Sequence, residues 1–130
     1  PNGGGKSTLF EALMGFVPLT AGEIIREKSM AIAYLPQQPM PRKILPLTVK
    51  DFVEMGTWGR SNSKPALSVT EALIEMGLSA LKNDLVSQLS GGQWKKASLA
   101  RCLVQSADLY LLDEPFNHLD LERKTDWVVF

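Results

Sequence analysis

The glycine-rich start of the chain constrains its fold more than any other stretch. Residues 1–8 read Pro-Asn-Gly-Gly-Gly-Lys-Ser-Thr, which match every position but the opening glycine of the phosphate-binding loop pattern G-x-x-x-x-G-K-[ST]. Glycines let several backbone N–H groups converge on a polyphosphate, and the helix that follows points the positive end of its dipole at the same ligand. The residues expected to bind a nucleotide are Asn2, Gly3, Gly4, Gly5, Lys6, Ser7 and Thr8.

Two side chains of this loop carry its expected chemistry. Lys6 is expected to reach the β- and γ-phosphates, and the Ser7 hydroxyl is expected to bind Mg²⁺. Because the opening glycine of the pattern would lie before Pro1, we expect the sequence to be a piece of a longer protein.

Composition bounds the class of protein. The 130 residues are 45% hydrophobic and 22% charged, as in one small globular domain or part of a larger one. Fourteen basic residues balance fourteen acidic ones, which makes a nucleic-acid partner unlikely because such proteins carry a basic excess. A single cysteine excludes an internal disulfide. No apolar stretch reaches about eighteen residues and no signal-peptide pattern is present, so we expect a cytosolic or peripheral protein.

The first third of the chain predicts one helix and two strands. Apolar residues at helical spacing follow the loop as far as Met14, and Gly15 is the expected end of that helix. A short strand is expected around Glu23–Ile25, and a second over Met30–Leu35, where Pro36 ends it.

The middle of the chain predicts short helices. Thr48, with Asp51 three residues later, is expected to open a helix that ends at Gly56. Ser68 and Glu71 form a capping-box pattern for a second helix, which is expected to run to about Met76. Ser90 is the expected cap of a third helix.

The stretch Leu109–Leu112 is continuously apolar and of strand length, as in the interior of a parallel sheet covered on both faces. It leads directly into Asp113-Glu114, at the edge where open α/β sheets bind their ligands. We expect Asp113 to hold Mg²⁺ through its shell and Glu114 to orient and deprotonate the attacking water. After Asp120, a last helix is expected to continue to Phe130.

A second anion-binding surface is predicted at Leu89-Ser90-Gly91-Gly92-Gln93, where a serine and two glycines stand at a helix N-terminus. One nucleotide rarely needs two cradles within one chain, so the second is expected to face the nucleotide bound by another copy. This stretch resembles the signature motif of ATP-binding-cassette (ABC) ATPases.

The resemblance extends in order along the chain. Gln37 matches the Q-loop glutamine, which implies a contact to Mg²⁺ and a hinge toward a transport partner. Residues 109–114 match the Walker B motif, and Asn117-His118-Leu119-Asp120 matches the D-loop at the dimer interface. The adenine-stacking aromatic and the switch histidine of the family match nothing in this sequence, and His118 does not take the latter role.

The resemblance implies an α/β fold of the P-loop NTPase (RecA-like) type, with a parallel-sheet core and a small helical subdomain between the Q-loop and the signature motif. The implied domain is partial, with core portions at 1–39 and 95–130 and the helical subdomain at about 40–94. It also implies ATP hydrolysis in a head-to-tail dimer, with ATP and Mg²⁺ bound at each interface. The implied second-copy contacts to ATP are Ser90, Gly91, Gly92, Gln93 and Asp120, and the implied Mg²⁺ ligands are Ser7, Gln37 and Asp113. The isolated piece is expected to be inactive.

Two kinds of ABC protein remain open. Residues 32–38 and 45–49 resemble the ATPase subunits of zinc and manganese importers. That resemblance implies transmembrane permease subunits, a periplasmic or extracellular metal-binding protein as an indirect partner, and a peripheral location on the cytoplasmic face of the inner membrane. The alternative is a soluble F-type ABC protein that acts on the ribosome, which residues 117–122 resemble.

Overall fold

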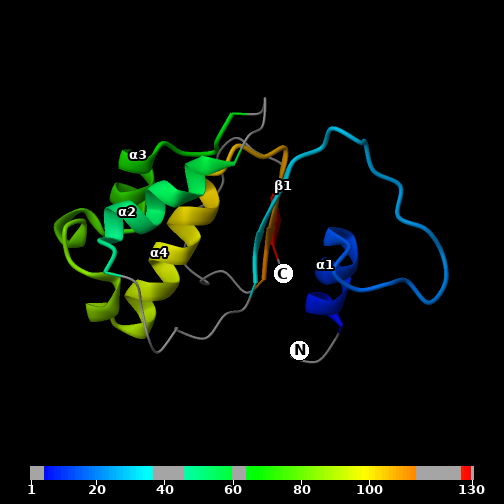
Figure 1. The fold of residues 1–130 in the computed structure, drawn as a ribbon, viewed down its shortest axis with the longest axis horizontal. Helices are drawn as coiled ribbons and strands as arrows, with labels where there is room; N and C mark the ends of the chain where they lie inside the picture. The colour runs from blue at the N-terminus through cyan, green and yellow to red at the C-terminus, as the bar shows by residue number, and fades with distance from the viewer. Residues whose placement is uncertain (1–4, 37–45, 60–63, 114–126, 130) are drawn as a thin grey trace.

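The computed structural model describes residues 5–36, 46–59, 64–113 and 127–129. Within these residues, a parallel sheet in the order β1-β2-β3 separates α1 on one face from α2, α3 and α4 on the other (Figure 1). The helices are α1 (Lys6–Met14), α2 (Val49–Glu54), α3 (Val69–Glu75) and α4 (Gly91–Leu103). Short 3-10 helices are η1 (Met55–Trp58), η2 (Ser79–Leu81) and η3 (Val86–Gln88), and the strands are β1 (Ile32–Leu35), β2 (Leu109–Leu112) and β3 (Trp127–Val129).

The central strand is the apolar run before Asp113. β2 pairs with β1 from Ile32↔Leu109 to Leu35↔Leu112, and with β3 from Tyr110↔Trp127. Its last three residues are buried, because helices cover both faces of the sheet. This arrangement confirms the predicted α/β fold with a parallel-sheet core.

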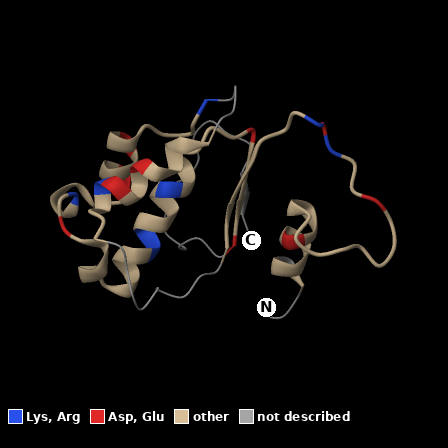
Figure 2. Cartoon of the chain, viewed as in Figure 1, with Lys and Arg blue, Asp and Glu red and all other residues tan. Residues whose placement is uncertain are grey.

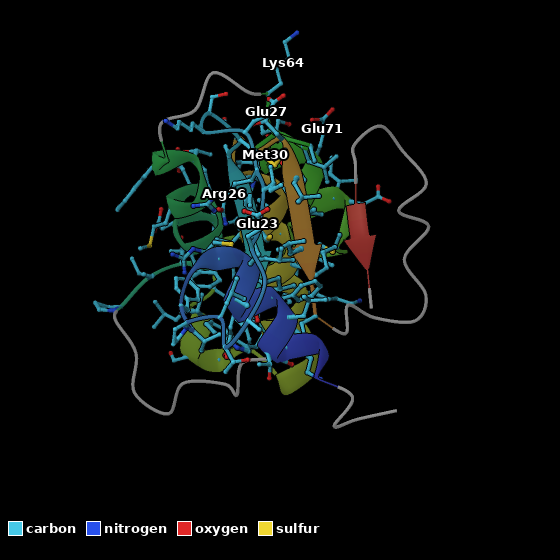
Figure 3. All side chains as sticks on the ribbon, turned by 90° about the vertical axis from the view of Figure 1, so that its right-hand side faces the viewer. Glu23, Arg26, Glu27, Met30, Lys64 and Glu71 are labelled. Carbon is cyan, nitrogen blue, oxygen red and sulfur yellow. The ribbon has the colours of Figure 1, made fainter. Side chains whose placement is uncertain are left out.

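Two predicted elements are wrong. No strand forms around Glu23–Ile25; these residues lie in an extended connection, residues 16–31, which we call the strap (Figure 3). Ile25 is 85% exposed there. The last helix predicted to reach Phe130 is also wrong over Trp127–Val129, which form β3. Two of these three residues are β-branched valines beside a tryptophan, residue types that favour strands.

The predicted caps are confirmed. Thr48 with Asp51, Ser68 with Glu71, and Ser90 with Gln93 each form a reciprocal capping box. In each box a side-chain oxygen accepts from a backbone N–H that the helix leaves unpaired. At the other helix ends, Gly15 and Gly77 adopt positive φ angles of 78° and 64°, a conformation that suits glycine after a helix.

The main core lies between β1 and β2 and the helices α2 to α4. α2 and η1 approach α4 closely at Gly56, where an added Cβ would lie 2.2 Å from the Arg101 carbonyl oxygen. Gly56 directly follows Met55, the C-cap of α2, so the α-helix ends where predicted. The chain continues there as η1 without a positive φ at Gly56, and the contact with α4, rather than backbone freedom, leaves no room for a side chain.

Charges are mixed over the described surface. Acidic and basic residues alternate along the strap, whereas the charged residues of α3 are acidic and those of α4 are basic (Figure 2). No described helix is long and apolar enough to cross a membrane. α4 runs unbroken across residues 94 and 95, where the boundary of the helical subdomain was expected, and that division stays a prediction.

Candidate functional site

The structure brings together two of the predicted metal ligands. Ser7 lies in the first turn of α1, and Asp113 directly follows β2. The Ser7 hydroxyl donates a hydrogen bond of 2.6 Å to Oδ2 of Asp113, across 106 residues of sequence. The Asp113 side chain is 6% exposed, and its backbone N–H donates to the Leu35 carbonyl at 3.0 Å. The carboxylate is therefore fixed at the carboxyl end of the sheet.

This pair fits a magnesium ion by its donor chemistry. Mg²⁺ prefers oxygen ligands and is commonly held by one or two carboxylates together with phosphates and water. Ser7 and Asp113 offer a hydroxyl and a carboxylate oxygen in direct contact. Gln37, the third predicted ligand, lies outside the described residues, as does the predicted base Glu114.

The start of α1 is open to an anion. Its N-cap, Gly5, has a φ angle of 75° and no side chain caps the helix. No acidic residue occupies the first turn, so no carboxylate of that turn offsets the unpaired N–H groups and the positive end of the helix dipole. Gly5, Lys6, Ser7 and Thr8 lie at this end, whereas Asn2, Gly3 and Gly4 are outside the described residues. Their nucleotide-binding roles stay predictions.

The predicted signature stretch forms the start of α4. The Ser90 hydroxyl accepts from the Gln93 N–H at 3.2 Å, and the Gln93 side chain accepts from the Ser90 N–H at 2.8 Å. Gly91 and Gly92 are exposed, and an added Cβ at either would meet no atom within 4 Å. The backbone there is thus accessible to a ligand from outside the chain.

The two predicted phosphate-binding ends do not share a face of the sheet. α1 lies on one side and α4 on the other (Figure 1). The cross-copy roles of Ser90, Gly91, Gly92 and Gln93 stay predictions, and Asp120 lies outside the described residues.

Sequence reasoning missed an aromatic contact behind the site. The rings of Phe10 on α1 and Tyr34 on β1 meet edge to face, with centroids 5.7 Å apart and planes at 73°. Burial, then the nearby carboxylates of Asp113 and Glu11, raise the pKa of the Tyr34 hydroxyl above its ordinary value. The alternation along β1, with Ala33 and Leu35 packed toward the helical core, already places Tyr34 on the opposite face.

A second missed feature is a cavity of about 410 Å³ beside the end of β1, lined mainly by residues of α2 and α4. The Phe52 and Trp94 rings lie 4.9 Å apart between centroids, and the Arg101 guanidinium lies 5.0 Å from the centre of the Phe52 ring. The lining residues are Tyr34, Leu35, Pro36, Phe52, Trp94, Ser98, Arg101, Cys102 and Gln105.

The family model described as ABC transporter matches residues 1–117. The chain is 41% identical over 132 residues to the zinc transport system ATP-binding protein TroB of Treponema pallidum, covering 92% of this chain and 50% of that protein. It is 38% identical to the zinc import ATP-binding protein ZnuC of Vibrio cholerae, covering 97% of this chain and 46% of that protein. The manganese transport system ATP-binding protein MntA of Synechocystis is 37% identical, with 94% and 52% covered. The chain spans about half the length of these curated relatives.

Solved structures share the fold. One is described as a metal-chelate type ABC transporter in an inward-facing conformation, with a TM-score of 0.72 and 30% identity. It is covered over 59% of its chain, and this chain over 100%. Another is an archaeal ribosome recycling factor in complex with a ribosomal stalk protein, with a TM-score of 0.71 and 31% identity. That match covers 99% of this chain and 27% of the other.

Proposed function

The chain belongs to the ABC transporter family, and on that premise we propose that the complete protein hydrolyses ATP to drive import of a metal ion, zinc or manganese. The observation that carries the ATPase proposal is the contact between Ser7 and Asp113. It joins the predicted phosphate-binding loop to the predicted metal carboxylate at the end of a central strand.

Each residue has a role in this proposal. Lys6 and the backbone N–H groups at the start of α1 bind the phosphates, and Ser7 and Asp113 hold Mg²⁺. Bound there, Mg²⁺ would offset the negative charge of the β- and γ-phosphates. Glu114 orients a water molecule and accepts its proton as the water oxygen bonds to the γ-phosphorus, while the bond from that phosphorus to the β–γ bridging oxygen breaks and ADP leaves.

We propose that two copies, or this protein and a paired ABC ATPase, act head to tail. The separation of α1 and α4 on opposite faces of the sheet supports this arrangement. The exposed Gly91 and Gly92 would then approach the nucleotide on the partner together with Ser90, Gln93 and Asp120. ATP would bridge the two copies, and hydrolysis would release them.

The metal-import proposal rests on the curated relatives. Zinc and manganese transport proteins are 37% to 41% identical to this chain. The ribosome recycling factor is 31% identical and has a TM-score of 0.71, against 0.72 for the transporter. This similarity supports the ribosome-acting protein as the alternative function. Among the described residues, no group of three or more histidine, cysteine or carboxylate side chains could hold a metal ion. A separate permease and a periplasmic or extracellular binding protein would therefore handle the transported ion.

The cavity beside Pro36 is the proposed permease contact. One of its lining residues, Pro36, directly precedes Gln37 in the sequence. The cavity also combines the Phe52 and Trp94 rings with the positive charge of Arg101. Engagement of a permease there would hold the protein peripherally at the cytoplasmic face of the membrane.

The test uses the complete protein and its Glu114→Gln variant. We expect ATP binding to be retained and turnover to fall by about 10²–10⁴, the usual contribution of a general base, or roughly 2.7–5.5 kcal/mol of barrier. Lys6→Ala is expected to weaken nucleotide binding instead. Unchanged turnover in Glu114→Gln contradicts the catalytic assignment.

ATP-dependent zinc or manganese uptake with the cognate permease tests the transport role, whereas ATP-dependent co-sedimentation with ribosomes without such uptake supports the alternative.

A further inference from the structure

We propose that the ring contact between Phe10 and Tyr34, which we call the clasp, sets the separation of the Ser7 hydroxyl and the Asp113 carboxylate and so the affinity of the site for Mg²⁺. Tyr34 is thus a positioning residue that acts through α1. This inference rests on the proposed nucleotide site, and it adds a residue to which the sequence motifs assign no role in binding the nucleotide or Mg²⁺.

The clasp joins the buried side chain of α1 to β1. Phe10 is fully buried, whereas Leu9 beside it is 51% exposed. Among the described side chains of α1, Phe10 is the one that is buried. Its ring contact with Tyr34 is therefore one of the contacts that hold α1 on the sheet.

Each residue of the clasp is connected to one of the two proposed Mg²⁺ ligands, Ser7 or Asp113. Phe10 follows Ser7 by three positions, which is about one helical turn and places both on one side of α1. Tyr34 is bonded to Leu35, whose carbonyl accepts from the Asp113 N–H at 3.0 Å. The Ser7–Asp113 hydrogen bond of 2.6 Å completes a closed ring of contacts, which we call the circuit.

This closed circuit explains why a ring behind the site can matter at the ion. A movement of α1 along or away from β1 would change the distance between the Ser7 and Asp113 oxygens, because about one turn of helix, one peptide unit and two direct contacts connect them. Mg²⁺ demands near-ideal octahedral geometry with short metal–oxygen distances. Loss of the clasp is therefore expected to weaken the binding of Mg²⁺ more than the binding of the nucleotide, because the backbone of the loop also binds the nucleotide.

The hydroxyl of Tyr34 has no required role in this proposal. The phenol remains neutral, because burial and the carboxylates of Asp113 and Glu11 raise its pKa. The ring alone makes the contact with Phe10. Tyr34→Phe is therefore the matched variant that separates the ring from the hydroxyl.

The experiment measures binding rather than turnover. The Kd of the complete protein for a fluorescent N-methylanthraniloyl ATP is measured in EDTA and again in excess Mg²⁺, at a temperature where hydrolysis is negligible. The ratio of the two values is the Mg²⁺-linked gain. Tyr34→Leu is expected to lower this gain by about tenfold, the lower end of the effect of residues that support metal ligands. Tyr34→Phe is expected to keep the gain within about twofold, and the EDTA value is expected to stay unchanged in both.

A control separates positioning from general loss of stability. Leu73→Ala removes a buried side chain from α3, on the face of the sheet opposite α1, and is expected to keep the Mg²⁺-linked gain. If Tyr34→Leu does not fold, Phe10→Leu removes the other ring of the clasp and is judged by the same ratio.

The outcomes are distinct. A parent protein that binds no ATP in either condition refutes the proposed function and, with it, the clasp. ATP binding with a Mg²⁺-linked gain that both Tyr34→Leu and Phe10→Leu leave intact refutes the clasp alone. An equal fall in Tyr34→Phe or in Leu73→Ala also refutes it, since the effect would then belong to the hydroxyl or to stability.

Discussion

The Ser7 hydroxyl and the Asp113 carboxylate lie 2.6 Å apart in a direct hydrogen bond, although 106 residues of sequence separate them. A hydrogen bond to a carboxylate is among the stronger polar contacts, and this one joins α1 to the end of β2. Two oxygens suited to a hard cation are thus in place through the fold itself. The contact gives the most direct physical test of the site.

Asp113→Asn is the variant for that test. The amide oxygen still accepts from Ser7, but the negative charge that would hold Mg²⁺ is gone. We expect the Mg²⁺ concentration for half-maximal ATP hydrolysis by the complete protein to rise by about 10- to 100-fold. Nucleotide affinity in EDTA is expected not to fall. An unaltered Mg²⁺ requirement would show that Asp113 does not hold the ion.

Ser90→Ala and Ser68→Ala form a matched pair. Each serine caps its helix through the same reciprocal box, so each substitution is expected to reduce the free energy of unfolding by about 1 kcal/mol. Only Ser90 belongs to the predicted cross-copy cradle. We therefore expect ATP-dependent dimerisation, measured by light scattering, to fall in Ser90→Ala and not in Ser68→Ala. Equal dimerisation in the two variants would leave the cradle without support from this residue.

Gly56→Ala tests the packing of η1 on α4. The added Cβ would lie 2.2 Å from the Arg101 carbonyl oxygen and 2.6 Å from Cγ2 of Val104. Backbone cannot yield to such a contact, so we expect a loss of about 1–3 kcal/mol in urea unfolding. Gly59→Ala is the control, because its Cβ would meet no atom within 4 Å and its φ angle of −66° suits any residue. A stability of Gly56→Ala equal to that of Gly59→Ala contradicts the packing described.

Cys102 predicts a dependence of stability on alkaline pH. Burial raises the pKa of its thiol from 9.0 to about 12, so the folded protein retains this proton where the unfolded chain loses it. The contribution of Cys102 to stability is therefore complete below pH 9.0 and declines as the pH rises from 9.0 towards about 12. The difference in unfolding free energy between the parent and Cys102→Ala, measured in urea, is expected to shrink over that range. A constant difference would show that the thiol titrates alike in both states.

The parts of the fold that sequence predicted correctly are those with local causes. A capping box such as Ser68 with Glu71 is complete within four residues, so its pattern identifies the helix start without knowledge of the rest of the chain. The strand before Asp113 is continuously apolar, and this local pattern alone predicts burial on both faces of the sheet.

The failures have long-range causes. A strand needs a neighbour, and residues around Ile25 have none among the described strands, although their local pattern favours extension. Gly56 carries the same letter as a helix-ending glycine, and only the approach of α4 shows that space, not backbone freedom, requires it. In the site, the motif predicted Ser7 and Asp113. The motifs assign no role in the site to Phe10 or Tyr34, because their contact depends on which helix covers which face of β1.

Tyr110 gives the helical layer a fixed point on the sheet. Its hydroxyl donates to the Gln105 carbonyl just after α4, and it accepts from the Ala66 N–H just before α3 at 2.9 Å. One oxygen atom of β2 therefore tethers the segments flanking two helices. A tilt of α3 and α4 relative to β2 that preserves both bonds would keep these flanking segments next to the Tyr110 oxygen. Gln105 lies just beyond the C-terminal end of α4, so such a tilt would displace the opposite end of the helix, at Ser90, the most.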